Sequence, residues 1–149
     1  METELKLSEY EAVIFDMDGV LIDSEPLWKV AMEKVFSDLG CKLAKTDFQK
    51  TVGLRIDEVI SYWNKDQNLG VKDEKLVEID IINRMIELVC DHPVPLKGVN
   101  ETLAFLKSKH LKIGLATSSP NRLLEAVLSG LKIKQYFDIA HSAEFESYG

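Results

Sequence analysis

The chain has 149 residues, of which 46% are hydrophobic and 29% charged, and its formal net charge is -7. These values indicate a soluble globular protein of one or two domains that can bury a sizeable core. The acidic balance argues against a nucleic acid or an anionic membrane as partner, because both bind basic surfaces. The sequence shows no signal-peptide pattern and no apolar run near the roughly 18 residues of a membrane span, so we expect a cytoplasmic protein.

The first predicted element is a strand over residues 11–15, because residues 12–15 read Ala-Val-Ile-Phe. Such unbroken apolar runs are typical of parallel strands that are covered on both faces. Two carboxylates, Asp16 and Asp18, follow directly, and Gly19 comes next. The carboxyl end of a parallel strand is where α/β sheets usually hold their chemistry.

A long helical region is predicted after this turn. Apolar residues spaced three and four apart predict one helix that begins near Pro26 and ends near Gly40, and a second that begins at Ile56. A third helix is predicted over residues 73–90. An insert of this length is too long and too helical to be a loop.

The second half of the chain alternates between helices and strands. Residues 92–98 contain two prolines and a glycine, which predicts a linker, and Asn100 is expected to cap the helix that follows. A strand over 112–116, a helix over 120–128 and a short strand over 138–140 complete the pattern. This order predicts an α/β fold with a Rossmann-like parallel sheet and right-handed crossovers.

The same order predicts two domains. Residues 1–24 and 93–149 are expected to form the α/β core. Residues 25–92 are expected to form a helical cap inserted between the first strand of the core and the rest.

Asp16 and Asp18 are the first candidates for chemistry. Two neighbouring carboxylates repel each other unless a cation lies between them, and a hard cation such as Mg²⁺ binds oxygen ligands. With the metal bound, one carboxylate could attack phosphorus while the other served as acid and base. An Asp-rich turn at a strand end is the alternative, which the apolar strand and Gly19 disfavour. An EF-hand is excluded, because its glycine stands at position six of the loop and Gly19 would stand at position four.

The end of the second strand carries another candidate site. Thr117, Ser118 and Ser119 are followed by Pro120 and Asn121 at the start of a predicted helix. A helix N-terminus offers unpaired N–H groups and a positive dipole end, which together bind anions. Thr117 could donate its hydroxyl, and Ser118 its main-chain N–H, to a phosphate. Capping of the helix by Ser119 is the competing interpretation.

The predicted insert contributes further candidates. Gly53, Leu54 and Arg55 precede its second helix, and an arginine can bind a phosphate or sugar hydroxyls through two hydrogen bonds. A solvated arginine near a helix start would explain the same residue. Glu25, Trp28 and Trp63 could line the mouth of a pocket, although a place in the apolar core is the alternative for each tryptophan.

These motifs resemble those of the haloacid dehalogenase superfamily. Residues 16–25 are similar to its first motif and residues 115–119 to its second. The helical insert resembles the cap of the beta-phosphoglucomutase-like phosphatases. Residues 26–28 and 52–57 further resemble the 2-deoxyglucose-6-phosphate and hexitol phosphatases of that group.

The resemblance implies an Mg²⁺-dependent phosphatase of a small hexose or hexitol phosphate. Asp16 would be the nucleophile that forms an aspartyl-phosphate, and Asp18 the acid and base. Both would bind Mg²⁺, Asp18 through its main-chain carbonyl. The residues that would bind the phosphoryl group and the sugar are Thr117, Ser118, Asn121, Glu25, Gly53, Leu54 and Arg55.

The family pattern continues beyond these residues. The resemblance places a lysine directly after Gly149 and then a strand that ends in an acidic pair. Without them we expect an impaired site, since losing one charge partner costs a factor of about 10²–10³ in rate. We also expect an exposed apolar edge on the first strand, open to self-association. A non-catalytic phosphate-binding or interaction module and a phosphosugar mutase remain as alternatives.

Overall fold

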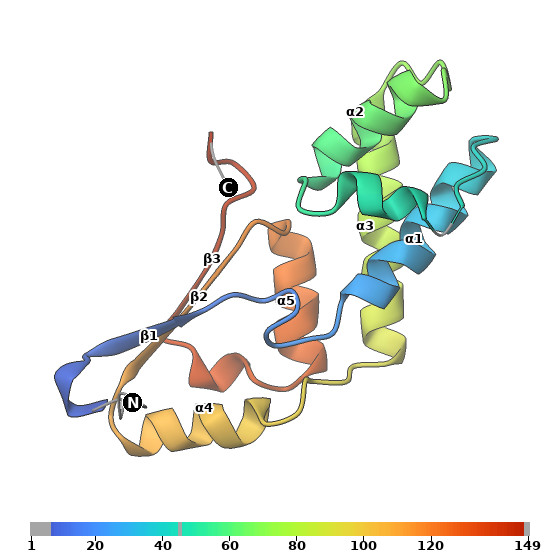
Figure 1. Cartoon of the computed structure of the whole chain (residues 1–149). Coiled ribbons are helices and arrows are strands. Elements are labelled where there is room, and N and C mark those ends of the chain that lie inside the picture. The colour runs from blue at the N-terminus through green and yellow to red at the C-terminus, as the bar shows by residue number, and fades with distance from the viewer. Residues whose placement is uncertain (1–6, 45, 148–149) are drawn as a thin grey trace, which may run out of the picture.

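The computed structural model describes residues 7–44 and 46–147, and it confirms the parallel sheet (Figure 1). In this part of the chain the strands are β1 (Ala12–Phe15), β2 (Lys112–Thr117) and β3 (Ile139–Ser142), in the order β1-β2-β3. The β1–β2 pairing aligns Ile14 with Gly114, and the β2–β3 pairing aligns Gly114 with Ile139.

The helices alternate with the strands as predicted, with small differences at their ends. They are α1 (Glu25–Asp38), η2 (Asp47–Thr51), α2 (Ile56–Asp66), α3 (Glu74–Asp91), α4 (Val99–Ser108), α5 (Asn121–Gly130) and the short helices η1 (Leu7–Glu9) and η3 (Lys134–Tyr136). None of the described helices has both the length and the apolar character that crossing a membrane requires. The cap predicted at Asn100 is wrong, because Gly98 turns the chain at φ 88° and Asn100 lies inside the first turn of α4.

Helices α1, α2 and α3 form a helical insert (residues 25–91) at one end of the sheet, where α1 and α2 both pack against α3 (Figure 1). The two linkers that connect it to the sheet are bonded to each other. Ile22 and Pro95 form an isolated bridge, and Leu96 N donates to Leu21 O at 3.0 Å. The predicted domain boundaries fall beside these linkers, and two independent domains remain a prediction.

One face of the sheet is covered and the other is open. Ile113 and Leu115 are buried on the face against which α4 and α5 pack, whereas Ile14 is 73% and Ile139 66% exposed on the opposite face. The prediction that the first strand is covered on both faces is therefore wrong. Both crossovers run in the same direction, so right-handed connections place α4 and α5 on the same face. Within the described residues β1 is also an edge strand, and self-association through it stays a prediction.

We predict that Leu103→Ala lowers the free energy of unfolding by about 2–5 kcal/mol, because it leaves a cavity in a packed core. Leu103 lies on α4 and is 0% exposed. Leu76→Ala is the matched control, since Leu76 lies on α3 and is 59% exposed. The control should change stability by no more than about 0.5 kcal/mol. Equal losses for the two variants in urea unfolding would contradict the assignment of the core.

Candidate functional site

The parallel pairing of β1 with β2 brings their carboxyl ends side by side. Asp16 and Asp18 follow β1 and flank Met17, which is 0% exposed. Gly19 then reverses the chain at φ 72°, and its N–H donates to Ile22 O at 2.9 Å. The Met17 side chain between them is buried in the core, and the two aspartates line two different hollows.

Three donors hold the Asp18 carboxylate. Ser24 Oγ and Trp28 Nε1 donate to Oδ1, the indole at 3.2 Å, and Ser119 Oγ donates to Oδ2 at 2.7 Å. Ser24 and Trp28 lie at the start of the helical insert, whereas Ser119 belongs to the loop after β2. Asp18 therefore connects the insert to the end of β2.

Ser119 does not cap α5, which was the competing interpretation of this segment. The N-cap of α5 is Pro120, without a side-chain hydrogen bond. The Ser119 hydroxyl instead bonds Asp18. Sequence reasoning missed this contact and that of Ser24, because neither hydroxyl stands near Asp18 in a helical or strand spacing.

Asp16 lies in a hollow of about 430 Å³ together with Thr117 and Ser118. Its Oδ1 accepts from Met17 N at 2.6 Å, and the side chain is exposed. The Thr117 hydroxyl accepts from Ser119 N at 3.1 Å and still has its own proton to donate. No lysine or arginine lines this hollow among the described residues.

A second hollow, of about 440 Å³, separates the helical insert from the sheet. Of the residues predicted from the sequence it contains Asp18, Ser118, Glu25, Gly53, Leu54 and Arg55. Ser118 lines both hollows and so marks the place where they meet. Sequence reasoning gave no site role to three apolar residues that also line this hollow: Met32, Phe48 and Val59.

Asn121, predicted to assist phosphate binding, lines neither hollow. Its main-chain N–H donates to Glu144 Oε2 at 3.0 Å, so this donor at the start of α5 is already used by a carboxylate of the chain itself. Glu25 is also paired, with Lys29 Nζ 2.8 Å away. The hydrogen bond from Lys29, and then its charge, hold the pKa of the Glu25 carboxyl below its usual value.

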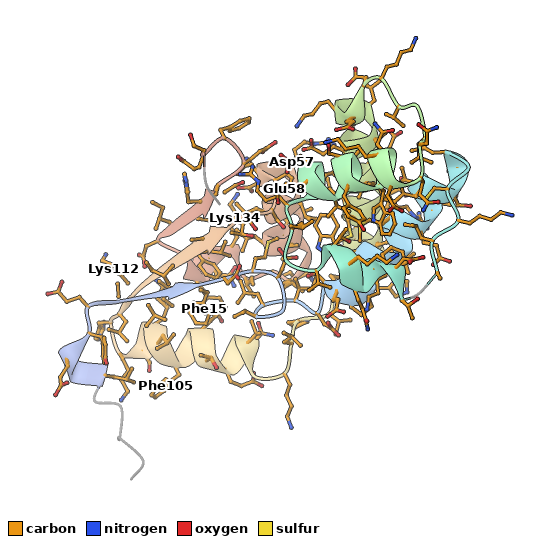
Figure 2. All side chains as sticks on the ribbon, turned by 45° about the horizontal axis from the view of Figure 1, so that its top comes forward. Phe15, Asp57, Glu58, Phe105, Lys112 and Lys134 are labelled. Atoms are coloured by element: carbon orange, nitrogen blue, oxygen red, sulfur yellow. The ribbon has the colours of Figure 1, made fainter. Side chains whose placement is uncertain are left out.

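Arg55 lines the hollow between the insert and the sheet, and its side chain reaches the segment after β3. It donates through Nη1 to Glu146 O and through Nη2 to Glu144 O, each at 3.3 Å. Its Nε lies 3.6 Å from Asp57 Oδ1. Figure 2 places Asp57 and Glu58 at the end of α2 that is turned toward the sheet.

The residues present fit a sparse Mg²⁺ site. No group of three acidic, histidine or cysteine residues among those described could hold a metal ion. Mg²⁺, however, is commonly held by one or two protein carboxylates, with water and substrate phosphate as its other ligands. The exposed Asp16 carboxylate suits that role, whereas the Asp18 carboxylate is taken up by its three donors.

Comparison with known proteins assigns this arrangement to a class of hydrolases. The profile of the haloacid dehalogenase-like hydrolases matches residues 13–147. The chain therefore belongs to the haloacid dehalogenase-like hydrolase family, and the resemblance drawn from the two motifs is confirmed.

Two curated relatives are phosphatases. Hexitol phosphatase B of Escherichia coli K12 is 41% identical over 134 residues, which cover 89% of this chain and 60% of that protein. The phosphorylated carbohydrates phosphatase of Thermotoga maritima is 36% identical over 134 residues, 87% of this chain and 59% of that protein. The chain thus spans about 60% of the length of these relatives.

Solved structures of the family share the fold. The beta-phosphoglucomutase of Clostridium difficile has a TM-score of 0.75 at 25% identity, covering 90% of this chain and 62% of that chain. CbbY of Rhodobacter sphaeroides, solved in complex with phosphate, also has a TM-score of 0.75, covering 89% of this chain and 63% of that chain. At 17% identity this second likeness concerns the fold alone.

We predict that Ser24→Ala lowers the free energy of unfolding by about 1.5 kcal/mol, because it removes a hydrogen bond to a charged acceptor. Ser24 is 3% exposed, so water cannot readily replace the lost hydroxyl. Ser108→Ala is the control, since that exposed hydroxyl bonds only Phe105 O within α4. If urea unfolding gives the same small loss for both variants, the Ser24 bond to Asp18 contributes nothing to the fold.

Proposed function

We propose that this protein hydrolyses the phosphate monoester of a small sugar or hexitol, with Asp16 as the nucleophile. The observation that carries the proposal is the placement of Asp16 and Asp18 in two hollows that share Ser118. A phosphoryl group held at Ser118 would have a carboxylate on one side and the sugar on the other. The names of the two curated phosphatases support the same class of substrate.

In the first half-reaction an Asp16 oxygen attacks phosphorus, and the bond from phosphorus to the ester oxygen breaks. Asp18 gives its proton to the departing alcohol oxygen, so the sugar leaves as a neutral alcohol. In the second half-reaction Asp18, now a carboxylate, takes a proton from water, and that water attacks the phosphorus of the aspartyl-phosphate. Inorganic phosphate leaves, and both aspartates return to their starting states.

The loop after β2 is suited to hold the phosphoryl oxygens. Thr117 has a hydroxyl proton to donate, and the Ser118 N–H lies at the same strand end. Asp16 and the main-chain carbonyl of Asp18 would hold Mg²⁺, which when bound neutralises charge on the phosphoryl oxygens. Asp18 needs no metal for its orientation, because Ser24, Trp28 and Ser119 already fix it.

The helical insert would act as a cap over the sugar. The hollow between the insert and the sheet has a largely apolar lining that includes Trp28, Met32 and Phe48. The C–H groups of a small sugar could pack on these side chains, while Glu25 and Lys29 in the same hollow could bond its hydroxyls. Closing the insert over the site would exclude bulk water while Asp16 attacks.

We further propose that residues 1–149 alone turn over slowly. Among residues 7–44 and 46–147, no lysine or arginine lines the hollow of Asp16 to balance the negative charge of the phosphoryl group. A missing charge partner of this kind costs a factor of about 10²–10³ in rate.

The test is an assay of phosphate release from hexitol and hexose 6-phosphates by the 149-residue chain with Mg²⁺. We expect slow release that Asp16→Asn abolishes and that chelation of Mg²⁺ suppresses. Glu33→Gln, on the exposed side of α1, is the control and should leave the rate unchanged. Release that survives Asp16→Asn would contradict the proposed nucleophile, and full-speed release would contradict the proposed impairment.

The same assay separates the two alternatives. The fold shared with a beta-phosphoglucomutase keeps a mutase under consideration, and isomerised sugar phosphate without released phosphate would identify it. Phosphate that binds without turnover would identify a non-catalytic binding module. A cytoplasmic location also stays a prediction.

A further inference from the structure

Arg55 makes a contact that its predicted role does not explain. The sequence placed it against the sugar, yet its two terminal nitrogens bond the main chain of the segment after β3. Nη1 donates to Glu146 O and Nη2 to Glu144 O, each at 3.3 Å. Asp57 Oδ1 lies 3.6 Å from the remaining nitrogen, Nε, and helps to orient the guanidinium. In this arrangement each terminal nitrogen of Arg55 is already bonded to a main-chain carbonyl.

The contact lies far from the linkers that attach the insert to the sheet. Those linkers pair through Ile22 and Pro95 at the base of α1 and α3. Figure 1 shows the loop before α2 facing the segment after β3, away from these linkers. A hydrogen bond at the mouth of the hollow resists rotation of the insert about its linkers more effectively than one near the linkers, because it acts farther from the hinge.

The segment that Arg55 binds is itself hydrogen-bonded to the start of α5 and to the loop after β2. Glu144 Oε2 accepts from Asn121 N at the start of α5, and Glu144 N donates to Ser142 Oγ at 3.1 Å. Ser142 Oγ in turn donates to Ser119 O at 2.7 Å. A continuous set of hydrogen bonds therefore runs from Arg55 on the insert to Ser119, which also bonds Asp18.

We infer that Arg55 is a positioning residue that holds the helical insert closed on the sheet by gripping the carbonyls of residues 144 and 146. The inference rests on the proposed function only in assigning the insert the role of a cap. Arg55 acts on the main chain, so the grip does not depend on any side-chain charge of the segment it holds. Sugar phosphates would enter after Arg55 releases these carbonyls and would be enclosed when it binds them again.

The experiment measures the distance between the insert and the sheet, without substrate, by electron paramagnetic resonance. Spin labels are placed at Lys65→Cys on α2 and Glu101→Cys on α4, two exposed positions, in a Cys90→Ser background. Cys41 is 3% exposed and should stay unlabelled. The parent should give one narrow distance distribution. Arg55→Ala should add a second, longer distance and raise the open population about tenfold, as expected for losing hydrogen bonds from a charged donor.

Two further variants define what Arg55 does. Arg55→Lys keeps the charge but cannot bond two carbonyls with a planar fork, so it should give an intermediate open population. Glu144→Gln removes the side-chain charge but keeps both main-chain carbonyls and an oxygen that can accept from Asn121 N, so it should leave the distance distribution closed. If Glu144→Gln opens the insert as far as Arg55→Ala does, the contact is an ion pair and the inference is wrong.

Two other arginines serve as comparisons, one on the insert and one on α5. Arg84→Ala is the matched control, because Arg84 pairs with Glu87 on its own helix at 2.7 Å. Arg122→Ala removes the hydrogen bond from α5 to Asn83 of α3, at 2.8 Å. An unchanged distribution in Arg55→Ala, or opening by Arg122→Ala alone, would overturn the inference. Far-UV circular dichroism confirms that each variant is folded.

The distance measurement is independent of turnover, so the two proposals fail separately. If Arg55→Ala opens the insert while no variant releases phosphate, the closing role of Arg55 stands and the proposed phosphatase fails. If the parent releases phosphate and Arg55→Ala leaves the distances unchanged, the phosphatase stands and the closing role fails.

Discussion

The parallel pairing of β1 with β2 is the constraint on which the site depends. It aligns Phe15 with Leu115, so the turn after β1 and the loop after β2 leave the sheet side by side. A one-residue shift in the register of β1 against β2 would move Asp18 away from Ser119, whose hydroxyl donates to Asp18 Oδ2 at 2.7 Å. The same register therefore places the loop after β2 beside both aspartates.

The helical insert adds to this arrangement through contacts at both ends of the hollow. Near the linkers Ser24 and Trp28 bond Asp18, and at the mouth Arg55 bonds the segment after β3. Both sets of contacts lead to Ser119, one through Asp18 and the other through Ser142 and its neighbours. The position of the insert and the orientation of Asp18 are thus linked by hydrogen bonds between described residues.

The sequence was informative where local chemistry decides the structure. The order of strands and helices, and the turn after Phe15, follow from apolar periodicity and from the pattern of aspartates and glycine. It misled where long-range geometry decides. Whether Ile14 is covered depends on the direction of both crossovers. The partner of Arg55 lies some ninety positions away in the chain, where no periodicity can indicate it. Ser119 was assigned a local cap, although its partner Asp18 is equally remote in sequence.

The central claim is that Asp16 carries the phosphoryl group, and mass spectrometry tests it most directly. The chain is incubated with Mg²⁺ and a hexitol phosphate, quenched in acid and digested, and the peptide that contains Asp16 is weighed. The account predicts that this peptide gains the mass of one phosphoryl group, and that Asp16→Asn shows no such gain. A phosphoryl group found on Thr117 or Ser118 instead, or turnover with an unmodified Asp16, would contradict the account.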